Sequence, residues 1–270
     1  INMNERIVQD IKEWFDRYIQ KFKSSDADWQ RNIDLKEKHT RKVGKEILFI
    51  GEKLGLSNNA LNLAEVIALL HDIGRFEQFA TYNTFVDRDS ADHAELSIKI
   101  IRENNILNKI DESIQGLILR TILYHNRLTL PQKETKKCLF FTKLLRDADK
   151  LDIWRVVIDY YNDKENGIQN DTIELGLPDT PGISYKVYKD LLERKTVKFI
   201  NLKNLNDFKL LQIGWVYDIN FLPTFQTIKN RHYLERIRNY IPKSMKINEI
   251  FDVVQSYMDE KIVNKKGLVV

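Results

Sequence analysis

Apolar residues recur every three or four positions along most of the chain, and this spacing restricts the fold more than any other feature. Ile7, Ile11, Trp14, Phe15 and Tyr18 show the pattern near the N-terminus. Such a stripe is typical of an amphipathic α-helix that buries one face. Similar stripes predict further helices over about residues 35–54, 60–72, from 92 onward, 111–126, 139–163, 184–194, 204–219, 224–240 and 247–263.

Glycine and proline gather in one stretch, which contains Gly167, Gly176, Pro178, Pro181 and Gly182. This stretch predicts a boundary or a lid between two helical parts. Residues 75–92 look like a loop, and only residues 173–175 and 196–200 resemble short strands. The pattern therefore predicts an all-α protein. We expect a helical domain over residues 1–165, with its core at 35–155, and a helical extension over 166–270 that packs on it or forms a lid.

Composition excludes several classes of protein. Of the 270 residues, 43% are hydrophobic and 30% are charged, which is ordinary for a globular protein and excludes general disorder. No apolar run approaches the 18 residues or so that span a membrane. The net charge of +4 is too small to indicate a nucleic-acid partner. A single cysteine, Cys138, excludes a disulfide framework and fits a reducing compartment such as the cytoplasm. The sequence also shows no signal-peptide pattern, so we expect a cytoplasmic location.

Four of the five histidines fall on apolar helical stripes. His39 lies four positions after Leu35, and His71 lies four after Ile67. His125 continues the stripe of the predicted helix 111–126, and His93 lies at the start of another helix. A single histidine on an apolar face is more often a core residue bonded to a carbonyl group. Four of them on separate helices need another explanation, and metal binding supplies one.

Three aspartates share these surroundings. Asp72 follows His71 directly, and Asp149 and Asp152 lie four and seven positions after Leu145. A buried carboxylate without a partner costs several kcal/mol or more. No Lys or Arg shares these stripes within one turn except Arg155, so the pattern predicts a metal ion as the counter-charge. Imidazole and carboxylate together suit Zn, Fe, Mn, Ni or Co.

The local sequence around these residues resembles the HD superfamily of metal-dependent phosphohydrolases. Leu69-Leu70-His71-Asp72-Ile73-Gly74 is similar to the "LLHDIGK" segment of that family, and Ala148-Asp149-Lys150-Leu151 is similar to its closing "ADKL" segment. The resemblance covers about residues 35–155. It implies an all-α, multi-helix bundle of the HD type, to which the C-terminal helices are an addition. The two extra histidines are similar to the two-metal branch, which includes HD-GYP cyclic-dinucleotide phosphodiesterases and diadenosine tetraphosphate hydrolases.

The resemblance implies a set of metal ligands. His39, His71, Asp72 and Asp149 would bind the first ion. Asp72 would bridge to a second ion held by His93 and His125. Asp147 competes with Asp149 for its place, but Asp149 fits both the family segment and the Leu145 stripe.

The implied activity is hydrolysis of a nucleotide or another small phosphate ester by a metal-bound hydroxide at a two-metal site. The ions would be divalent: Fe, Mn, Ni, Co, Zn or Mg. Asp72, Asp152, Arg75 and Lys150 are the candidate catalytic residues, and Arg75, Arg127 and Lys150 are the candidates for substrate binding.

Two departures from the family pattern bear on the substrate. Arg75 stands where the family often has lysine, and Asn126-Arg127 stands where a "GYP" segment would follow His125. The second departure argues against cyclic di-GMP. Two alternatives stay open at this point: a di-iron oxygenase, which shares the six ligands, and a metal-bound ligand sensor without turnover.

Overall fold

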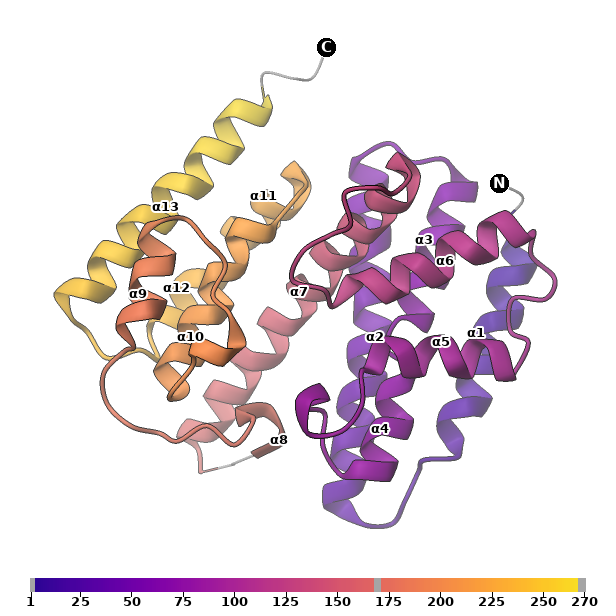
Figure 1. Cartoon of the computed structure of the whole chain (residues 1–270), viewed down its shortest axis with the longest axis horizontal. Helices are drawn as coiled ribbons and strands as arrows, with labels where there is room; N and C mark the ends of the chain where they lie inside the picture. The colour runs from indigo at the N-terminus through magenta and orange to yellow at the C-terminus, as the bar shows by residue number, and fades with distance from the viewer. Residues whose placement is uncertain (1–2, 168–170, 267–270) are drawn as a thin grey trace. The chain divides into compact units, whose positions relative to one another are not determined.

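The protein is helical throughout the residues that the computed structural model describes, 3–167 and 171–266 (Figure 1). This confirms the predicted all-α class. The α-helices are α1 (Glu5–Gln20), α2 (Ala27–Lys53), α3 (Asn58–Leu70), α4 (Gly74–Tyr82), α5 (His93–Glu103), α6 (Glu112–His125), α7 (Lys136–Glu165), α8 (Asp171–Glu174), α9 (Tyr185–Leu192), α10 (Leu205–Gly214), α11 (Leu222–Asn230), α12 (Tyr233–Arg238) and α13 (Met245–Lys266). Three short 3₁₀ helices are η1 (Asp87–Asp89), η2 (Phe199–Asn201) and η3 (Trp215–Asp218).

The chain forms two compact units, residues 1–152 and 153–270, and their border lies inside α7. In the first unit α3 packs against α1, α2 and α6, while α5 packs against α4 and α6. In the second unit α13 packs against α9 and α11, and α10 packs against α9 and α12. The functional division after residue 165, and the packing or lid role of the extension, stay predictions.

Capping residues explain where the helices of the first unit begin. The side chain of Asp26 accepts a hydrogen bond from the backbone N–H of Trp29 at the start of α2. The side chain of Asp92 accepts from the N–H groups of Ala94 and Glu95 at the start of α5. These contacts satisfy donors that have no partner within the helix. The Asp92 cap fixes the position of His93, the first residue of α5.

The prediction of a loop over residues 75–92 is wrong in its first half, where α4 lies. The helix predicted to run to residue 72 is α3, which ends at Leu70, and a turn of three residues joins it to α4. A glycine that follows a helical stripe is typical of a helix end, but Gly74 begins α4. Its role is close packing, because a Cβ atom there would lie 2.4 Å from the carbonyl oxygen of His93.

The predicted strands are also wrong. Residues 173–175 overlap α8, and residues 196–200 run into η2. The β-branched and aromatic residues of the second segment find no partner strand in the described part of the chain, and Ile200 is 86% exposed. Strand propensity without a pairing partner does not produce a strand. The helix predicted over 224–240 is two helices, broken where His232 adopts a left-handed conformation with φ of 52°. Residues 168–170 of the predicted boundary stretch lie outside the described residues.

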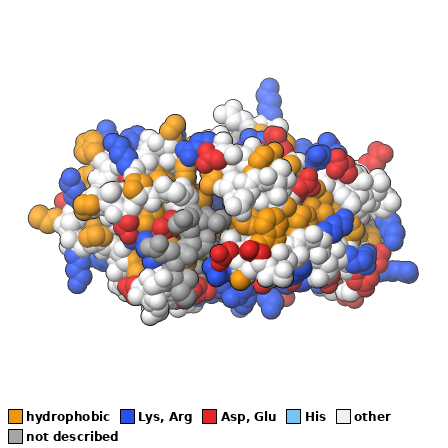
Figure 2. All heavy atoms as spheres, turned by 90° about the horizontal axis from the view of Figure 1, so that it is seen from below, with side chains coloured by type: hydrophobic (Ala, Val, Ile, Leu, Met, Phe, Trp, Pro, Cys, Tyr) orange, Lys and Arg blue, Asp and Glu red, His pale blue; other side chains and the backbone are white. Residues whose placement is uncertain are grey.

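Charged side chains of both signs are spread over the face shown in Figure 2, with hydrophobic side chains between them. Among the described helices, none combines the length with the apolar character that a membrane crossing needs.

Candidate metal centre

The six predicted metal ligands lie together inside the first unit. They come from α2, from the turn between α3 and α4, from the first residue of α5, from the last residue of α6, and from α7. All are buried except Asp149, whose side chain is 18% exposed. Groups of three bring one ligand atom each to within 4.8 Å of one another: His39, His71 and Asp72; His71, His125 and Asp149; and Asp72, His93 and His125.

His39 and His71 turn their Nε2 atoms toward the same two carboxylates. His39 Nε2 lies 3.1 Å from Asp149 Oδ1 and 3.8 Å from Asp72 Oδ2. His71 Nε2 lies 3.8 Å from Asp149 Oδ1 and 3.9 Å from Asp72 Oδ2. Two ligands of one ion, each at about 2.1 Å from it, lie at most about 4.2 Å apart. All four separations are below that limit, so these side chains fit one metal ion.

A second group lies on the other side of the Asp72 carboxylate. His93 Nε2 is 3.1 Å from His125 Nε2 and 3.5 Å from Asp72 Oδ1. The two oxygens of Asp72 therefore face different histidines: Oδ2 faces His39 and His71, and Oδ1 faces His93. This is the arrangement that a carboxylate needs in order to bridge two ions.

Each of the four histidines is oriented through its other ring nitrogen, Nδ1. His71 Nδ1 and His125 Nδ1 each lie 2.6 Å from a backbone carbonyl oxygen, of Ala68 and Ile122. Asp152 Oδ2 lies 2.8 Å from His39 Nδ1, and Asp87 Oδ2 lies 2.6 Å from His93 Nδ1. Carbonyl and carboxylate oxygens only accept hydrogen bonds, so Nδ1 is the donor in each ring. Such contacts leave Nε2 as the atom that binds a metal.

The free Nε2 atoms form the strongest indication of a metal. His71 Nε2 is buried and has no hydrogen-bond partner among the described residues. His93 Nε2 and His125 Nε2 face each other across 3.1 Å. Two neutral rings with Nδ1 as donor would place two lone pairs against each other there, and a cation or a proton between them would remove this repulsion. A divalent ion in the group of His71 and another in the group of His93 and His125 would supply what these nitrogen atoms lack.

The pKa values of two histidines favour the neutral form that a metal requires. Burial, together with the neighbouring His93 and His71, lowers the pKa of His125 to about 3. Burial and the Arg75 guanidinium lower the pKa of His93. His39 behaves differently: burial opposes its protonation, but hydrogen bonds to Asp149 and Asp152 outweigh burial and raise its pKa to about 9.

The pKa values of the Asp72 and Asp149 carboxyl groups both lie well below the usual range, so both groups are ionised. Burial opposes the charge of Asp72, but Lys36, His71, Arg75 and His93 keep its pKa well below the usual range. Lys36 Nζ lies 3.2 Å from Asp72 Oδ2, and Arg75 Nε lies 3.6 Å from Oδ1. The expectation that only Arg155 could supply a counter-charge is therefore wrong. Burial of Asp72 by itself therefore does not indicate a metal; the orientation of the imidazoles does.

The predicted outer residues occupy different positions. Asp152 contacts His39, and Arg75 borders the second group, with Nη2 3.4 Å from His93 Nε2. Lys150 is buried, and its Nζ donates to the carbonyl oxygen of Arg146 at 3.4 Å. The side chain of Arg127 is 44% exposed and pairs with acidic groups at the start of α5, among them Glu95 at 3.2 Å.

The structure distinguishes the two competing aspartates of α7. Asp149 contributes to one of the three-residue groups described above, whereas Asp147 belongs to no such group in the described residues. Asp147 is nevertheless fully buried. The two residues differ by two positions on one helix, so their side chains leave it in different directions.

The sequence analysis missed two charged residues of the site. Asp87 accepts hydrogen bonds from Arg75 Nη1 at 2.8 Å and from Gln78 Nε2 at 2.9 Å, and it also contacts His93. Asp87 lies in a connection without periodicity, which gives no signal. Lys36 precedes His39 by three positions and so lies on the same side of α2. This spacing of three residues could have indicated that Lys36 lies near the metal-site candidates.

Gly74 and Ser97 hold the two histidine-bearing segments together. Ser97 Oγ accepts from the N–H of Gly74 at 2.9 Å, and it lies 2.8 Å from the carbonyl oxygen of His71 and 2.9 Å from that of His93. A Cβ at Gly74 would lie 2.6 Å from the backbone nitrogen of Ser97. Only glycine allows α4 and α5 to approach this closely.

We expect Gly74→Ala to separate these segments. Its free energy of unfolding should fall by about 1–3 kcal/mol, as for other overpacked sites, because the new methyl group meets backbone atoms that cannot move alone. Urea denaturation measures this. The matched control is Gly44→Ala in α2, where a Cβ meets nothing within 4 Å; it should be neutral or stabilising by up to about 1 kcal/mol. Equal stability of the two variants would contradict the close-packing role of Gly74.

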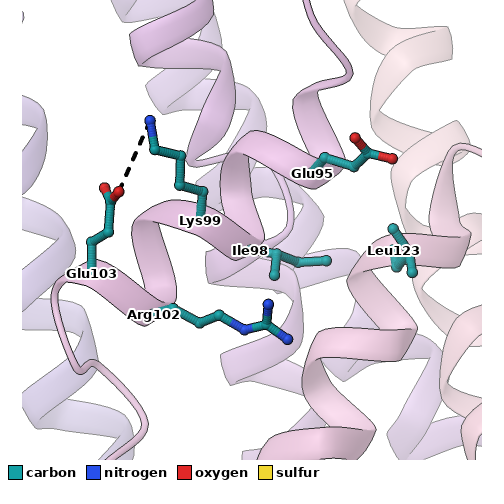
Figure 3. Close-up of a pocket in the computed structure, with 6 residues that line it drawn as sticks. All are labelled: Glu95, Ile98, Lys99, Arg102, Glu103 and Leu123. Carbon is teal, nitrogen blue, oxygen red and sulfur yellow. Dashed lines mark ion pairs between the residues drawn. The ribbon is translucent and has the colours of Figure 1, made fainter.

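A groove lined by α5 and α6 is separate from the cluster. It is lined by Glu95, Ile98, Lys99, Arg102 and Glu103 of α5 and by Leu123 of α6 (Figure 3). The groove contains none of the six candidate ligands.

The fold and the site together define a helical domain that gathers histidine and aspartate side chains from five segments into one buried cluster. The family model of the HD domain matches residues 37–154. The predicted resemblance is thereby confirmed over nearly the expected range. A search of curated proteins and a search of solved structures found no match. HD domains are mostly metal-dependent hydrolases.

Proposed function

We propose that this chain is a metal-dependent phosphohydrolase that cleaves a nucleotide or another small phosphate ester at two adjacent divalent metal ions. His39, His71, Asp72 and Asp149 would hold the first ion. Asp72, His93 and His125 would hold the second. The single cysteine, Cys138, is buried and free, which fits a reducing compartment, and we place the activity in the cytoplasm.

The observation that carries the proposal is that the two oxygens of Asp72 face the Nε2 atoms of different histidines. One of its oxygens lies within 3.9 Å of two Nε2 atoms, and its other oxygen lies 3.5 Å from a third. Two divalent ions there would outweigh the charge of Asp72 and Asp149. The net positive charge favours an anionic substrate such as a phosphate ester. Ions in such a pair lower the pKa of a water molecule and neutralise charge on phosphoryl oxygens.

The protein's own residues hold this site rigid. Asp152 and Asp87 orient two of the imidazoles, and backbone carbonyl groups orient the other two. The guanidinium of Arg75 is fixed by Asp87, by Gln78 at 2.8 Å and by the carbonyl oxygen of Phe85 at 2.6 Å. Because Arg75 borders the second group, we propose that it binds a phosphate oxygen.

A metal and substrate panel tests the proposal. The protein is stripped with a chelator, reloaded with Mn, Fe, Co, Ni, Zn or Mg, and offered nucleotides and other phosphate esters. We expect at least one pair to release phosphate or a nucleotide monophosphate, and we expect chelation to stop the release. Oxygen uptake is followed in parallel with the iron-loaded protein. Oxygen uptake without any cleavage of a phosphate ester would contradict the proposal and favour an oxygenase.

Asp87 should control the second ion. We expect Asp87→Ala to weaken binding of that ion by about 10–100-fold, because His93 loses the group that orients it. The first ion should bind as before, since the Nδ1 atoms of His39 and His71 have other partners. Stepwise titration of the stripped protein with metal measures both affinities.

The matched control is Asp89→Ala, an aspartate of the same 3₁₀ helix that pairs with Arg88 at 3.0 Å. It should leave both affinities unchanged. Equal weakening of both ions in Asp87→Ala would show a general loss of structure instead of orientation of His93.

A further inference from the structure

Lys36 contacts the metal cluster from α2, one turn before His39. Its Nζ lies 3.2 Å from Asp72 Oδ2, and its side chain is 17% exposed. That oxygen is the one that faces His39 Nε2 and His71 Nε2. The Lys36 ammonium therefore contacts the oxygen that the first ion would need.

The two cations beside Asp72 differ in how firmly they are held. Arg75 is fixed by Asp87, Gln78 and a backbone carbonyl group, so it has little freedom to move. Lys36 has Asp72 as its hydrogen-bond acceptor in the described contacts, and it lies 5.1 Å from the centre of the Phe85 ring. A lysine ammonium on a flexible four-carbon chain can turn away from a carboxylate, and an aromatic face stabilises a cation nearby.

We propose that Lys36 neutralises Asp72 in the metal-free protein, is displaced from Oδ2 by the first ion, and then binds an oxygen of the anionic substrate. This inference rests on the proposed function, because it assigns a substrate-binding residue to that site. The displacement follows from charge: a divalent ion attracts the carboxylate and repels the ammonium. The freed ammonium stays at the rim of the cluster, where a phosphate group would carry the nearest unpaired negative charge.

Lys36→Met tests both halves of the proposal, because it keeps the apolar chain and removes the charge. Two quantities are measured by calorimetry: the affinity of the stripped protein for Mn²⁺, and the affinity of the Mn²⁺-loaded protein for inorganic phosphate. Binding of Mn²⁺ should strengthen about tenfold or more, because the competing cation is gone. Binding of phosphate should weaken about tenfold to a hundredfold, since a charge-assisted hydrogen bond is lost.

A second variant and a control keep the test decisive. Lys36→Gln retains a donor for Asp72 without charge, and it should show the same two shifts even if Lys36→Met folds poorly. Lys38→Met changes an exposed lysine of the same helix and should shift neither affinity. Metal binding that weakens or does not change, or phosphate binding that does not change, would overturn the proposal. Opposite shifts in the two affinities, without hydrolysis of any ester, would support Lys36 as the anion ligand and contradict only the proposed hydrolase activity.

Discussion

Asp72→Asn is expected to remove nearly all of the proposed phosphohydrolase activity and most of the capacity to bind metal. The amide has about the size of the carboxylate, but it carries no charge and offers one oxygen where Asp72 offers two. The second ion would keep only His93 and His125 as protein ligands. The first ion would no longer share a bridging carboxylate with the second. Stabilisation by metal ions is worth several kcal/mol in the transition state, so the rate should fall about a thousandfold or more.

The metal-induced rise in melting temperature measures this prediction without relying on activity. A ligand that binds the folded state stabilises it according to its affinity, so the wild type should gain stability with Mn²⁺ and Asp72→Asn should gain little. The matched control is Asp190→Asn in the second unit, a buried aspartate that also pairs with a lysine, Lys186. It should lower stability and keep the full metal-induced rise. An equal rise in Asp72→Asn and the wild type would contradict the bridging role.

Helices that bury one face could be predicted because their signal is periodic. The bounds of α6 were predicted to within one residue at each end: the helix covers residues 112–125, and the prediction was 111–126. An aspartate and an asparagine flank it and mark its ends. α4 escaped prediction for a physical reason. The same glycine that permits its close approach to α5 also looks like a stop signal, and sequence alone does not separate the two uses.

The clustering of the candidate metal ligands could be predicted because polar side chains on apolar stripes are conspicuous. The sequence placed His39, His71 and His125 on buried faces, and the structure adds that their Nε2 atoms point to a common region. Periodicity gives the face of a helix but not the direction of a ring nitrogen. That direction depends on partners from other segments, such as the carbonyl oxygens of Ala68 and Ile122.

The charged residues around the ligands were the hardest to predict. Lysine is usually found on the solvent-exposed side of a helix, but the long side chain of Lys36 brings its ammonium group to Asp72. Asp87 lies in a connection whose conformation depends on Arg75 and Gln78. In both cases the position of the charge is set by tertiary contacts. A rule based on spacing along one helix therefore underestimated the positive charge near Asp72.

Replacing both His93 and His125 by alanine is expected to reduce the metal content from about two ions per chain to about one. The first ion would keep His39, His71, Asp72 and Asp149, whereas the second would keep only Asp72. The helical fold should survive, because each histidine is one ligand among several and the buried apolar core is unchanged. Activity should fall at least about a hundredfold, since the remaining ion provides only part of the charge stabilisation.

Elemental analysis of the wild type and the double variant decides this prediction, and circular dichroism verifies that the helices are intact. The control is His232→Asn, which changes the exposed fifth histidine between α11 and α12; asparagine tolerates the left-handed backbone there. This variant should keep both ions and full activity. If the wild type already saturates with one ion, or if the double variant keeps two, then His93 and His125 are not ligands of a second ion. The close contact of their Nε2 atoms would then have to be explained by a proton shared between the two rings.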